Sequence, residues 1–320
     1  MDNLMKQPVL KTCRLFAIAF AGFAFFSLPS LPVTADAYVL PAPYLLERVS
    51  TGINPASRFQ AIKTLRIEPA GPDEDENRRG RARSFDMVVS FNHPSMFRAD
   101  IRGDDLEHTH VASAGRYITL IDDVVAGRSA QWVYHFKHLF LQHSREELTD
   151  NLQSIGVRTG ISSIGRLDGG IFFVVGAQYP DSTVPQLWID RERFLPVRLV
   201  VTGASAEGEP PAAEIRFSRW SRQNGMRYPG EMTFFENGTE IQRIPLRQLD
   251  AEPAFDAGQF DIRALEAAAR SKERKSSQED FPDATPDATP DDSPDDSPDD
   301  AMDIYDEIRE EIEAFRQIFE

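Results

Sequence analysis

Hydrophobic and polar residues alternate along most of the chain, and this alternation predicts a protein built mainly of β-strands. In residues 85–91 the hydrophobic side chains are Phe85, Met87, Val89 and Phe91, with polar residues such as Asp86 between them. A period of two places such side chains on one face of a strand. Residues 97–102 repeat the pattern with charged residues on the opposite face. The pattern therefore predicts an antiparallel sheet with one buried face.

The same criteria predict about ten strands in all. They cover residues 59–66, 85–91, 97–102, 108–112, 117–121, 170–176, 186–190, 196–201, 214–220, 231–236 and 240–246. Three dipeptides that favour tight hairpin turns lie between strands, at residues 168–169 (Asp-Gly), 224–225 (Asn-Gly) and 237–238 (Asn-Gly). The turns support consecutive antiparallel pairing.

Three segments have helical spacing instead. Residues 40–51 predict a short amphipathic helix, residues 129–155 one or two helices packed across the sheet, and residues 264–270 a last short helix. The fold class is therefore α+β. A sheet of this length tends to curl, and a concave apolar face roofed by helices forms a pocket. An ordinary packed core explains the same pattern.

The first 37 residues have the order of a secretory signal peptide. Basic residues precede an apolar run at 15–26, and the small-residue site Ala35-Asp36-Ala37 follows, so we expect cleavage before Tyr38. An uncleaved anchor is the alternative, but the run has only about 12 residues where about 20 are needed to span a bilayer. Cleavage would remove Cys13, the single cysteine. We therefore expect an exported, periplasmic protein with no disulfide and no membrane anchor.

The negative charge is concentrated at the carboxyl end. Residues 278–320 hold seventeen of the 51 Asp and Glu residues but two of the 35 Lys and Arg residues, so they account for −15 of the formal charge of −16. The remaining chain is almost neutral. It offers no basic face for a phosphate backbone, so we do not expect a nucleic-acid partner.

The carboxyl-terminal region divides into two parts. Residues 271–300 are rich in Pro and Asp and predict an extended acidic spacer. Residues 301–320 predict an acidic amphipathic helix. Its apolar positions are Ile304, Ile308, Ile312, Phe315 and Phe319. Such a tethered helix could dock onto its own domain, bind a partner protein or occupy a groove as a plug.

Candidate catalytic chemistry is sparse. All six histidines lie between His93 and His143, and the pairs His108/His110 and His135/His138 suggest a metal site, but their spacing matches no zinc motif. The chain has neither a Gly-x-Ser-x-Gly elbow nor a glycine-rich phosphate loop. We therefore expect a non-enzymatic protein without metal or cofactor, and keep a metal-dependent enzyme as a third hypothesis.

Residues 44–262 resemble the Lol-type lipoprotein-carrier superfamily, the lipoprotein-sorting proteins of the bacterial periplasm and outer membrane. Besides the first helix, the motifs are SFDMVV at 84–89, FRAD at 97–100, LWIDR at 187–191, LPVR at 195–198, FSRW at 217–220, NGMRYP at 224–229 and FDI at 260–262. The resemblance implies that residues 38–270 form an unclosed β-barrel with a helical lid. It also implies an apolar hollow that shields acyl chains in the periplasm.

The wide apolar faces of the sequence are compatible with that role. The candidate pocket residues are Phe85, Met87, Val89, Phe91, Phe97, Ile101, Leu187, Ile189, Leu199, Phe217 and Phe234, and the lid candidates are Trp132, Phe136 and Phe140. These side chains could equally pack against one another. The leading hypothesis is a carrier for lipids or acylated lipoproteins in outer-membrane sorting. The alternative is an envelope interaction or sensor module that uses the carboxyl-terminal helix.

Overall fold

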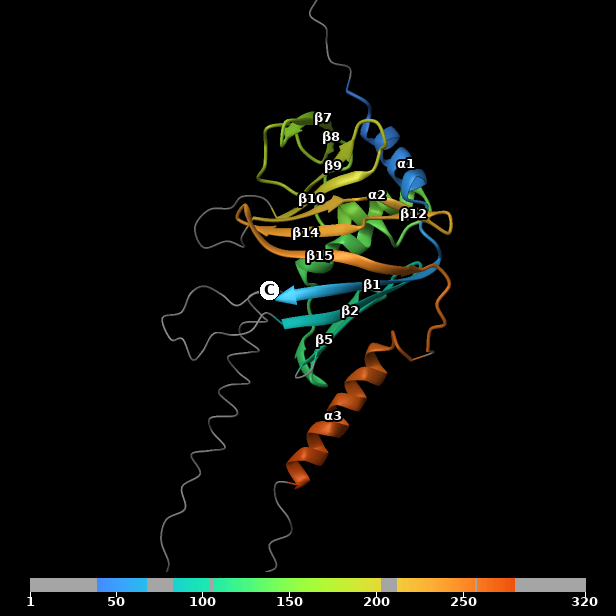
Figure 1. Ribbon diagram of the computed structural model, residues 1–320, viewed down its shortest axis with the longest axis vertical. Helices are drawn as coiled ribbons and strands as arrows, with labels where there is room; N and C mark the ends of the chain where they lie inside the picture. Colours follow the sequence, from blue (N-terminus) through green and yellow to red (C-terminus); the bar gives the residue numbers. More distant parts are fainter. Residues whose placement is uncertain (1–38, 68–82, 104–105, 203–211, 257, 280–320) are drawn as a thin grey trace, which may run out of the picture. The chain divides into compact units, whose positions relative to one another are not determined.

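One curved antiparallel sheet of 13 strands organises the part of the chain that the computed structural model describes (Figure 1). The described residues are 39–67, 83–103, 106–202, 212–256 and 258–279. The predicted signal peptide, most of the predicted spacer and the predicted helix at 301–320 lie outside these ranges.

The sheet has an unclosed order with two free edges. Its strands are β1 (Arg58–Ile67), β2 (Arg83–Asn92), β3 (Met96–Arg102), β4 (Glu107–Ser113), β5 (Arg116–Ile121), β6 (Val124–Gly127), β7 (Ser162–Leu167), β8 (Gly170–Val175), β9 (Gln186–Asp190), β10 (Pro196–Thr202), β11 (Ala213–Ser218), β14 (Glu231–Glu236) and β15 (Thr239–Asp250). The spatial order is β6-β5-β4-β3-β2-β1-β15-β14-β11-β10-β9-β8-β7. β1 and β15 join the two halves, and β6 and β7 form the edges. The predicted α+β fold with a curved, unclosed sheet is confirmed.

Every predicted strand is present, and four further strands were not predicted. Two of these are the edge strands β6 and β7, and the others are the short strands β12 (Ser221–Gln223) and β13 (Met226–Tyr228), which pair only with each other. β6 and β12, with four and three residues, are too short to show an alternation of hydrophobic and polar residues. β7 has the sequence SSIGRL, which carries only two hydrophobic residues.

The predicted hairpin turns have the expected backbone geometry. Asn224 and Gly225 have φ values of 48° and 86°, and the Asp168-Gly169 and Asn237-Gly238 pairs also have positive φ at both positions. Such values match the twist of the flanking strands. Asp122 and Asp123, between β5 and β6, likewise have positive φ, at 48° and 67°.

The first helix, α1 (Ala42–Ile53), follows the predicted amphipathic pattern. Its buried face includes Leu45, Leu46 and Val49. The helix ends where Asn54 adopts a left-handed conformation and its backbone N–H donates to the carbonyl of Ser50. A left-handed residue at this position is a common way for a helix to stop.

The predicted helical insert contains two different elements. Its first part is a 3₁₀-helix, η2 (Trp132–Leu139), and its second part is an α-helix, α2 (Arg145–Ser154). Ser144 caps α2 by accepting a hydrogen bond from the backbone N–H of Glu147 at 3.1 Å. The insert follows edge strand β6 and precedes edge strand β7, so this one segment carries the chain between the two free edges of the sheet.

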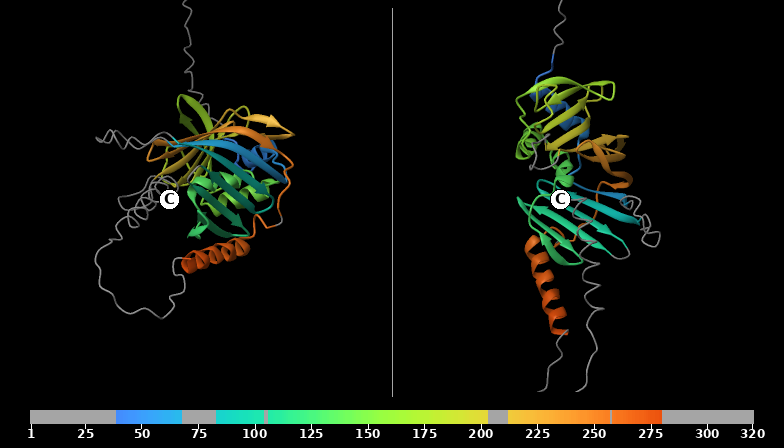
Figure 2. Two further views of the ribbon diagram at one scale, coloured as in Figure 1. Left: turned by 60° about the horizontal axis from the view of Figure 1, so that its bottom comes forward. Right: turned by 90° about the vertical axis from the view of Figure 1, so that its left-hand side faces the viewer.

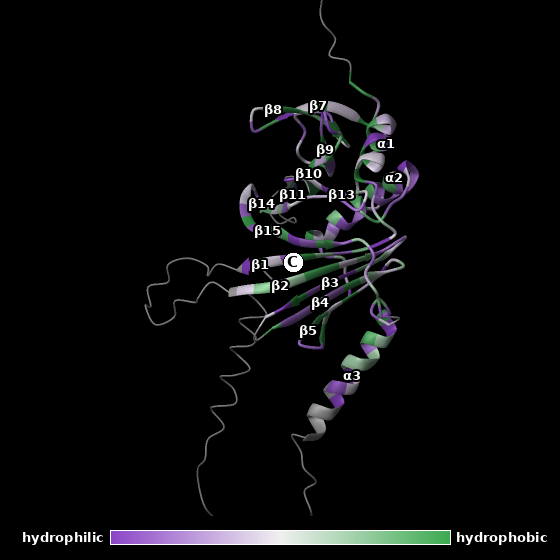
Figure 3. Ribbon diagram, turned by 45° about the vertical axis from the view of Figure 1, so that its right-hand side comes forward, coloured by the Kyte–Doolittle hydropathy of each residue, from purple (hydrophilic) through white to green (hydrophobic). Residues whose placement is uncertain are grey.

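The insert and α1 cover the inward face of the sheet. Figure 2 shows the strands curving around these helices, and the alternation of hydrophobic and hydrophilic residues along the strands is visible in Figure 3. A single cluster of buried hydrophobic residues includes side chains of α1, η2, α2 and most strands of the sheet. The curvature therefore encloses one continuous apolar interior.

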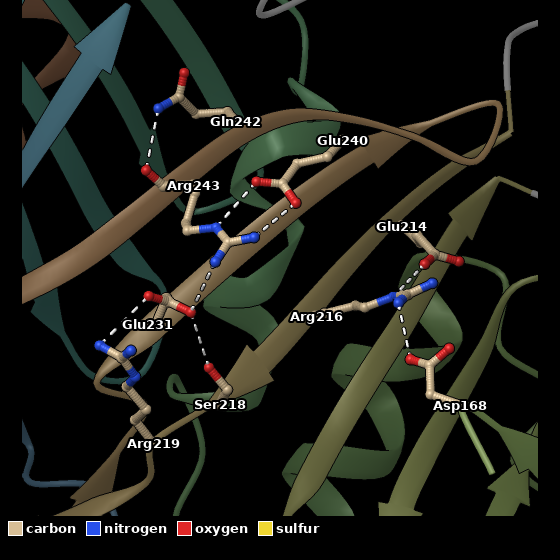
Figure 4. A network of polar contacts seen from close by, with 9 residues as sticks. All are labelled: Asp168, Glu214, Arg216, Ser218, Arg219, Glu231, Glu240, Gln242 and Arg243. Carbon is tan, nitrogen blue, oxygen red and sulfur yellow. Dashed lines mark hydrogen bonds and ion pairs between the residues drawn. The ribbon is translucent and has the colours of Figure 1, made fainter. Parts of the chain in front are cut away.

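The outward face is polar over β11, β14 and β15 and carries salt bridges along the strands. Figure 4 shows Arg216 between Glu214 and Asp168, at 2.7 and 3.1 Å, and Arg243 near Glu231 at 3.9 Å. These groups face away from the apolar interior. They identify this part of the convex surface as the solvated side of the sheet.

The last helix, α3 (Ile262–Glu279), is longer than predicted and packs on the outward face of β4 and β5. Ile262 and Ala269 are buried against Val111, Ile118 and Leu120. The prediction ended the helix at residue 270 and assigned the following residues to the spacer. The structure corrects this boundary, because residues 271–279 continue the helix. Lysine, arginine, glutamate and glutamine in this stretch have good helix propensity.

A second outward cluster requires a glycine. Trp188 and Val174 lie on the outward side of β9 and β8, and Gly165 of β7 is beneath them. A Cβ atom at Gly165 would lie 2.6 Å from Cη2 of Trp188 and 2.9 Å from Cγ2 of Val174. The indole ring therefore occupies the space of the missing side chain.

We expect Gly165→Ala to lower the free energy of unfolding by about 1–3 kcal/mol, because the methyl group overpacks this cluster. Gly160→Ala is the matched control, since a Cβ atom there has no neighbour within 4 Å. The control should change stability by less than about 0.5 kcal/mol. Urea unfolding followed by tryptophan fluorescence measures both, and equal stabilities would contradict the packing assigned to Gly165.

Candidate functional site

All eleven candidate pocket residues lie on the inward face of the sheet. They come from β2, β3, β9, β10, β11 and β14, and each is buried. The set is Phe85, Met87, Val89, Phe91, Phe97, Ile101, Leu187, Ile189, Leu199, Phe217 and Phe234, and all belong to the same hydrophobic cluster. The structure thus brings together residues that are up to 149 positions apart in the sequence.

The lid candidates lie directly over these residues. The ring of Phe136 in η2 is 5.9 Å from that of Phe97 and 6.5 Å from that of Phe234, centroid to centroid. Phe140 is 5.8 Å from Phe91. Trp132 is half-buried, with its ring 6.2 Å from that of Phe234. The segment predicted as a lid is therefore in contact with the predicted pocket.

The structure shows this interior in a filled arrangement. The sheet residues and the lid aromatics occupy the same volume, with fully buried rings such as Phe91, Phe97 and Phe136. A ligand could reach the inward face only where η2 moved away from it. Contact between these residues and a ligand remains a prediction.

The interior also contains a lysine. Lys63 of β1 is in phase with the hydrophobic residues of its strand, so its side chain points inward and is 1% exposed. Its Nζ atom lies 3.2 Å from Sδ of Met232, and 4.7 and 5.3 Å from the ring centroids of Phe136 and Tyr228. No carboxylate among the described residues pairs with it. Burial lowers the pKa of Lys63 to about 7.

A second lysine is buried within the lid itself. Lys137 of η2 is 3% exposed, and its Nζ atom has no hydrogen-bond partner among the described residues. It lies 5.9 Å from the ring centroid of Phe97 and 5.6 Å from that of Tyr117. Burial lowers the pKa of Lys137 to about 8. Both lysines are thus held by aromatic rings rather than by counter-charges.

Our prediction from the sequence overlooked these two lysines. Lys63 alternates in register with Phe59, Ala61 and Leu65, and Lys137 follows the lid residue Phe136. A cation in phase with apolar residues is the pattern that could have identified Lys63. Long lysine side chains usually keep the ammonium group in water, which is why the pattern alone suggests an exposed amine.

The histidines meet in space without forming a metal centre among the described residues. His110 stacks on Tyr134 with a ring distance of 4.7 Å, and its Nδ1 atom is 2.9 Å from Oγ1 of Thr119. Burial first, and then the charges of Lys137 and neighbouring histidines, lower the pKa of His110 to about 3. In the described ranges, no group of three or more His, Cys, Asp or Glu side chains has an arrangement suited to a metal ion.

The lid is attached at its carboxyl end by polar contacts. The hydroxyl of Ser50 in α1 donates to Oε1 of Gln142 at 2.6 Å, and both side chains are buried. Asn151 of α2 donates to the carbonyl of Leu141 at 2.7 Å. These contacts fix the junction between η2 and α2, while η2 itself is held mainly by hydrophobic packing.

Comparison with solved structures finds matches at low sequence identity and with TM-scores below 0.5. A DUF1329 family protein from Desulfovibrio piger has 12% identity and a TM-score of 0.45, and the match covers 70% of this chain and 97% of that chain. A putative outer-membrane lipoprotein-sorting protein domain from Vibrio parahaemolyticus has 9% identity, a TM-score of 0.43 and the same coverages. A LolA superfamily protein from Nitrosomonas europaea has 10% identity and a TM-score of 0.44, covering 68% and 97%.

No family model matches the chain, and no curated protein matches it. Within the described ranges, no helix has the length and hydropathy needed to cross a bilayer. The predicted partner helix, with Ile304, Ile308, Ile312, Phe315 and Phe319, lies outside the described residues and stays a prediction.

The buried lysine gives a testable pH dependence. In the folded protein Lys63 loses its proton near pH 7, whereas in the unfolded chain it keeps it up to its ordinary value of 10.5. Between these values the unfolded state binds more protons, so the free energy of unfolding rises with pH. Lys63→Met removes this contribution. We therefore expect the stability advantage of the Met variant over the wild type to be largest at pH 7 and below, and to shrink toward pH 9.5.

Urea unfolding at a series of pH values between 6.5 and 9.5 measures the effect. Lys272→Met is the matched control, because Lys272 is exposed and its pairing with Asp123 raises its pKa. That substitution should leave the pH dependence in this interval unchanged. Identical pH dependence in the wild type and in Lys63→Met would show that the amine of Lys63 is hydrated in the folded protein.

Proposed function

We propose that this protein is a non-enzymatic binding or carrier protein for lipids or acylated lipoproteins. The ligand's acyl chains would occupy the inward face of the sheet in place of η2. Together with the predicted signal peptide, this supports a role in the periplasm, in sorting to the outer membrane. The observation that carries the proposal is that a long 3₁₀-helix with a buried lysine, unpaired among the described residues, covers the apolar interior.

Two features of η2, which covers the interior, reduce its stability in this position. η2 spans residues 132–139 as a 3₁₀-helix, although such helices rarely exceed one turn because their hydrogen bonds are less well aligned. It buries Lys137 without a counter-ion and lies against Lys63. Burial of an unpaired cation costs several kcal/mol. A helix selected only for stability would avoid both features. A helix that must move off the sheet benefits from a small free-energy difference between its packed and displaced positions.

An acyl chain offers a suitable replacement for the side chains of η2. The faces below the lid are aromatic and aliphatic, and each buried CH₂ group contributes about 0.8 kcal/mol. A chain of 16 carbons could thus supply roughly 12 kcal/mol before the costs of association and of moving the lid are subtracted. This is enough to compete with packing by Phe136 and Phe140.

The polar groups of the interior also suit such a ligand. The hydroxyl of Tyr228 has no hydrogen-bond partner among the described residues, and the amine of Lys63 has only a sulfur atom within hydrogen-bonding distance. A lipid ester, a lipid amide or a carboxylate brings oxygen acceptors into the interior. Those acceptors would satisfy donors that the protein alone leaves unsatisfied.

The proposal predicts that weakening the lid strengthens ligand binding. Phe136→Ala removes the ring that contacts Phe97 and Phe234, so displacement of η2 requires less free energy. We expect affinity for a fluorescent fatty acid, cis-parinaric acid, to increase at least about tenfold, which corresponds to about 1.4 kcal/mol. Stability should fall at the same time by about 3 kcal/mol. Fluorescence titration of the exported protein, purified without detergent, gives the affinity.

Val174→Ala is the matched control, because it weakens the outward cluster around Trp188 and leaves the lid intact. This variant should lose stability without gaining affinity. Phe136→Leu provides a milder test of the same contact if the alanine variant does not fold. The carrier proposal would be wrong if the wild type carried no lipid in native mass spectrometry and neither Phe136 variant bound the probe.

A further inference from the structure

A surface pocket of about 550 Å³ opens at the end of the domain where α1 terminates. α1 contributes Arg48, Thr51 and Gly52, and the other walls come from the β9–β10 turn and the β12–β13 hairpin. Figure 1 shows α1 and β12 on the same side of the molecule. The complete lining is Arg48, Thr51, Gly52, Glu192, Arg193, Leu195, Trp220, Ser221, Arg222 and Arg227.

The lining is strongly basic, although residues 1–277 are almost neutral overall. It holds four arginines and one carboxylate, that of Glu192. Among the described residues, no carboxylate forms a salt bridge with Arg48, Arg193 or Arg222. Elsewhere on the surface the arginines pair repeatedly with acidic neighbours, as Arg216 does with Glu214 and Asp168. The pocket therefore concentrates positive charge that the folded domain does not neutralise.

Two of the arginines are held in position by uncharged groups. Nη1 of Arg227 donates to the carbonyl of Gly52 at 2.8 Å, and the guanidinium of Arg48 lies 4.8 Å from the ring centroid of Phe194. These contacts leave most guanidinium N–H groups free. The hydrogen bond to Gly52 also satisfies one carbonyl at the negative end of α1, which would otherwise repel an anion.

The floor of the pocket is apolar and continuous with the interior under the lid. Leu195 is 3% exposed and belongs to the main hydrophobic cluster. The ring of Trp220 is 6.3 Å from that of the lid residue Phe140 and 6.2 Å from that of Phe217. Its Nε1 atom donates to the carbonyl of Pro196 at 2.9 Å, which fixes the indole. One ring thus separates the basic rim from the proposed acyl site.

We infer that this pocket binds the phosphate group of an anionic amphiphile whose apolar part lies under the lid, an inference that rests on the proposed function. Guanidinium groups match the geometry of phosphate oxygens and bind them in a bidentate manner. A purely acidic peptide such as poly-aspartate would satisfy the arginines, but it offers no apolar segment for the floor formed by Leu195 and Trp220. A phosphorylated lipid satisfies both parts of the pocket.

The test compares ligands that differ only in head group. Dioctanoyl phosphatidylglycerol and dioctanoylglycerol have equal acyl chains, but only the first carries a phosphate group. We expect the full-length protein to bind the anionic lipid at least about tenfold more tightly at low salt, measured by calorimetry below the micellar concentration. The double substitution Arg193→Gln and Arg222→Gln should reduce this preference to less than about twofold and leave dioctanoylglycerol binding unchanged.

The matched control is the double substitution Arg166→Gln and Arg274→Gln, which removes the same charge at exposed positions outside the pocket. It should retain the preference, which would exclude an effect of net charge alone. Equal binding of both lipids by the wild type would overturn the inference while leaving the carrier proposal intact.

Inorganic phosphate and a poly-aspartate peptide distinguish the remaining outcomes. Phosphate binding that disappears in Arg193→Gln/Arg222→Gln, without binding of either lipid, would support an oxyanion site and contradict the carrier proposal. Arginine-dependent binding of poly-aspartate together with equal lipid affinities would overturn the phosphate assignment in favour of an acidic polypeptide. Absence of binding by all four ligands would overturn both proposals.

Discussion

The structure depends on the need to cover one apolar face of a sheet that does not close. The two edge strands, β6 and β7, are consecutive in the chain but lie at opposite ends of the sheet. The segment between them must cross from one edge to the other, and the inward face is where its hydrophobic side chains can be buried. η2 and α2 therefore serve as the connection and the cover at once. Their position follows from the topology, while their residues decide how firmly they are held.

The stability of that cover is limited by one polar group within it, Lys137, and one beneath it, Lys63. Phe136 and Phe140 contribute packing, whereas Lys63 and Lys137 oppose it, because each amine is removed from water without a counter-charge. Aromatic rings compensate part of this cost through cation–π contacts. The sheet is held in addition by backbone pairing between neighbouring strands, although Lys63 itself belongs to β1. The domain thus combines a stable curved sheet with a less stable cover, and functional motions are drawn from the less stable parts of a protein.

The sheet could be predicted well from the sequence, because a strand with one buried and one exposed face has hydrophobic residues at every second position. The sequence predicted which side chains share the inward face for the same reason, since the register follows from alternation and turn residues such as Asn224-Gly225. Two features could not be predicted from it: the 3₁₀ form of η2 arises from tertiary packing, and the burial of Lys63 arises because neighbouring strands and the lid enclose its side chain. The continuation of α3 to Glu279 was missed, although the helix propensity of this polar segment indicates it.

The basic pocket could not be predicted from the sequence, because its residues come together only in the folded structure. Arg48, Arg193 and Arg222 belong to three segments with no common motif, and each resembles an ordinary solvated arginine. The fold places them around Trp220, whose ring contacts the interior cluster. The charged rim of the pocket is then complementary to the head group of an amphiphile, and the apolar floor is complementary to its tail. The same curvature that requires a cover for the inward face also brings the end of that face to the surface, so the proposed acyl site and the proposed head-group site are neighbours because of one topology.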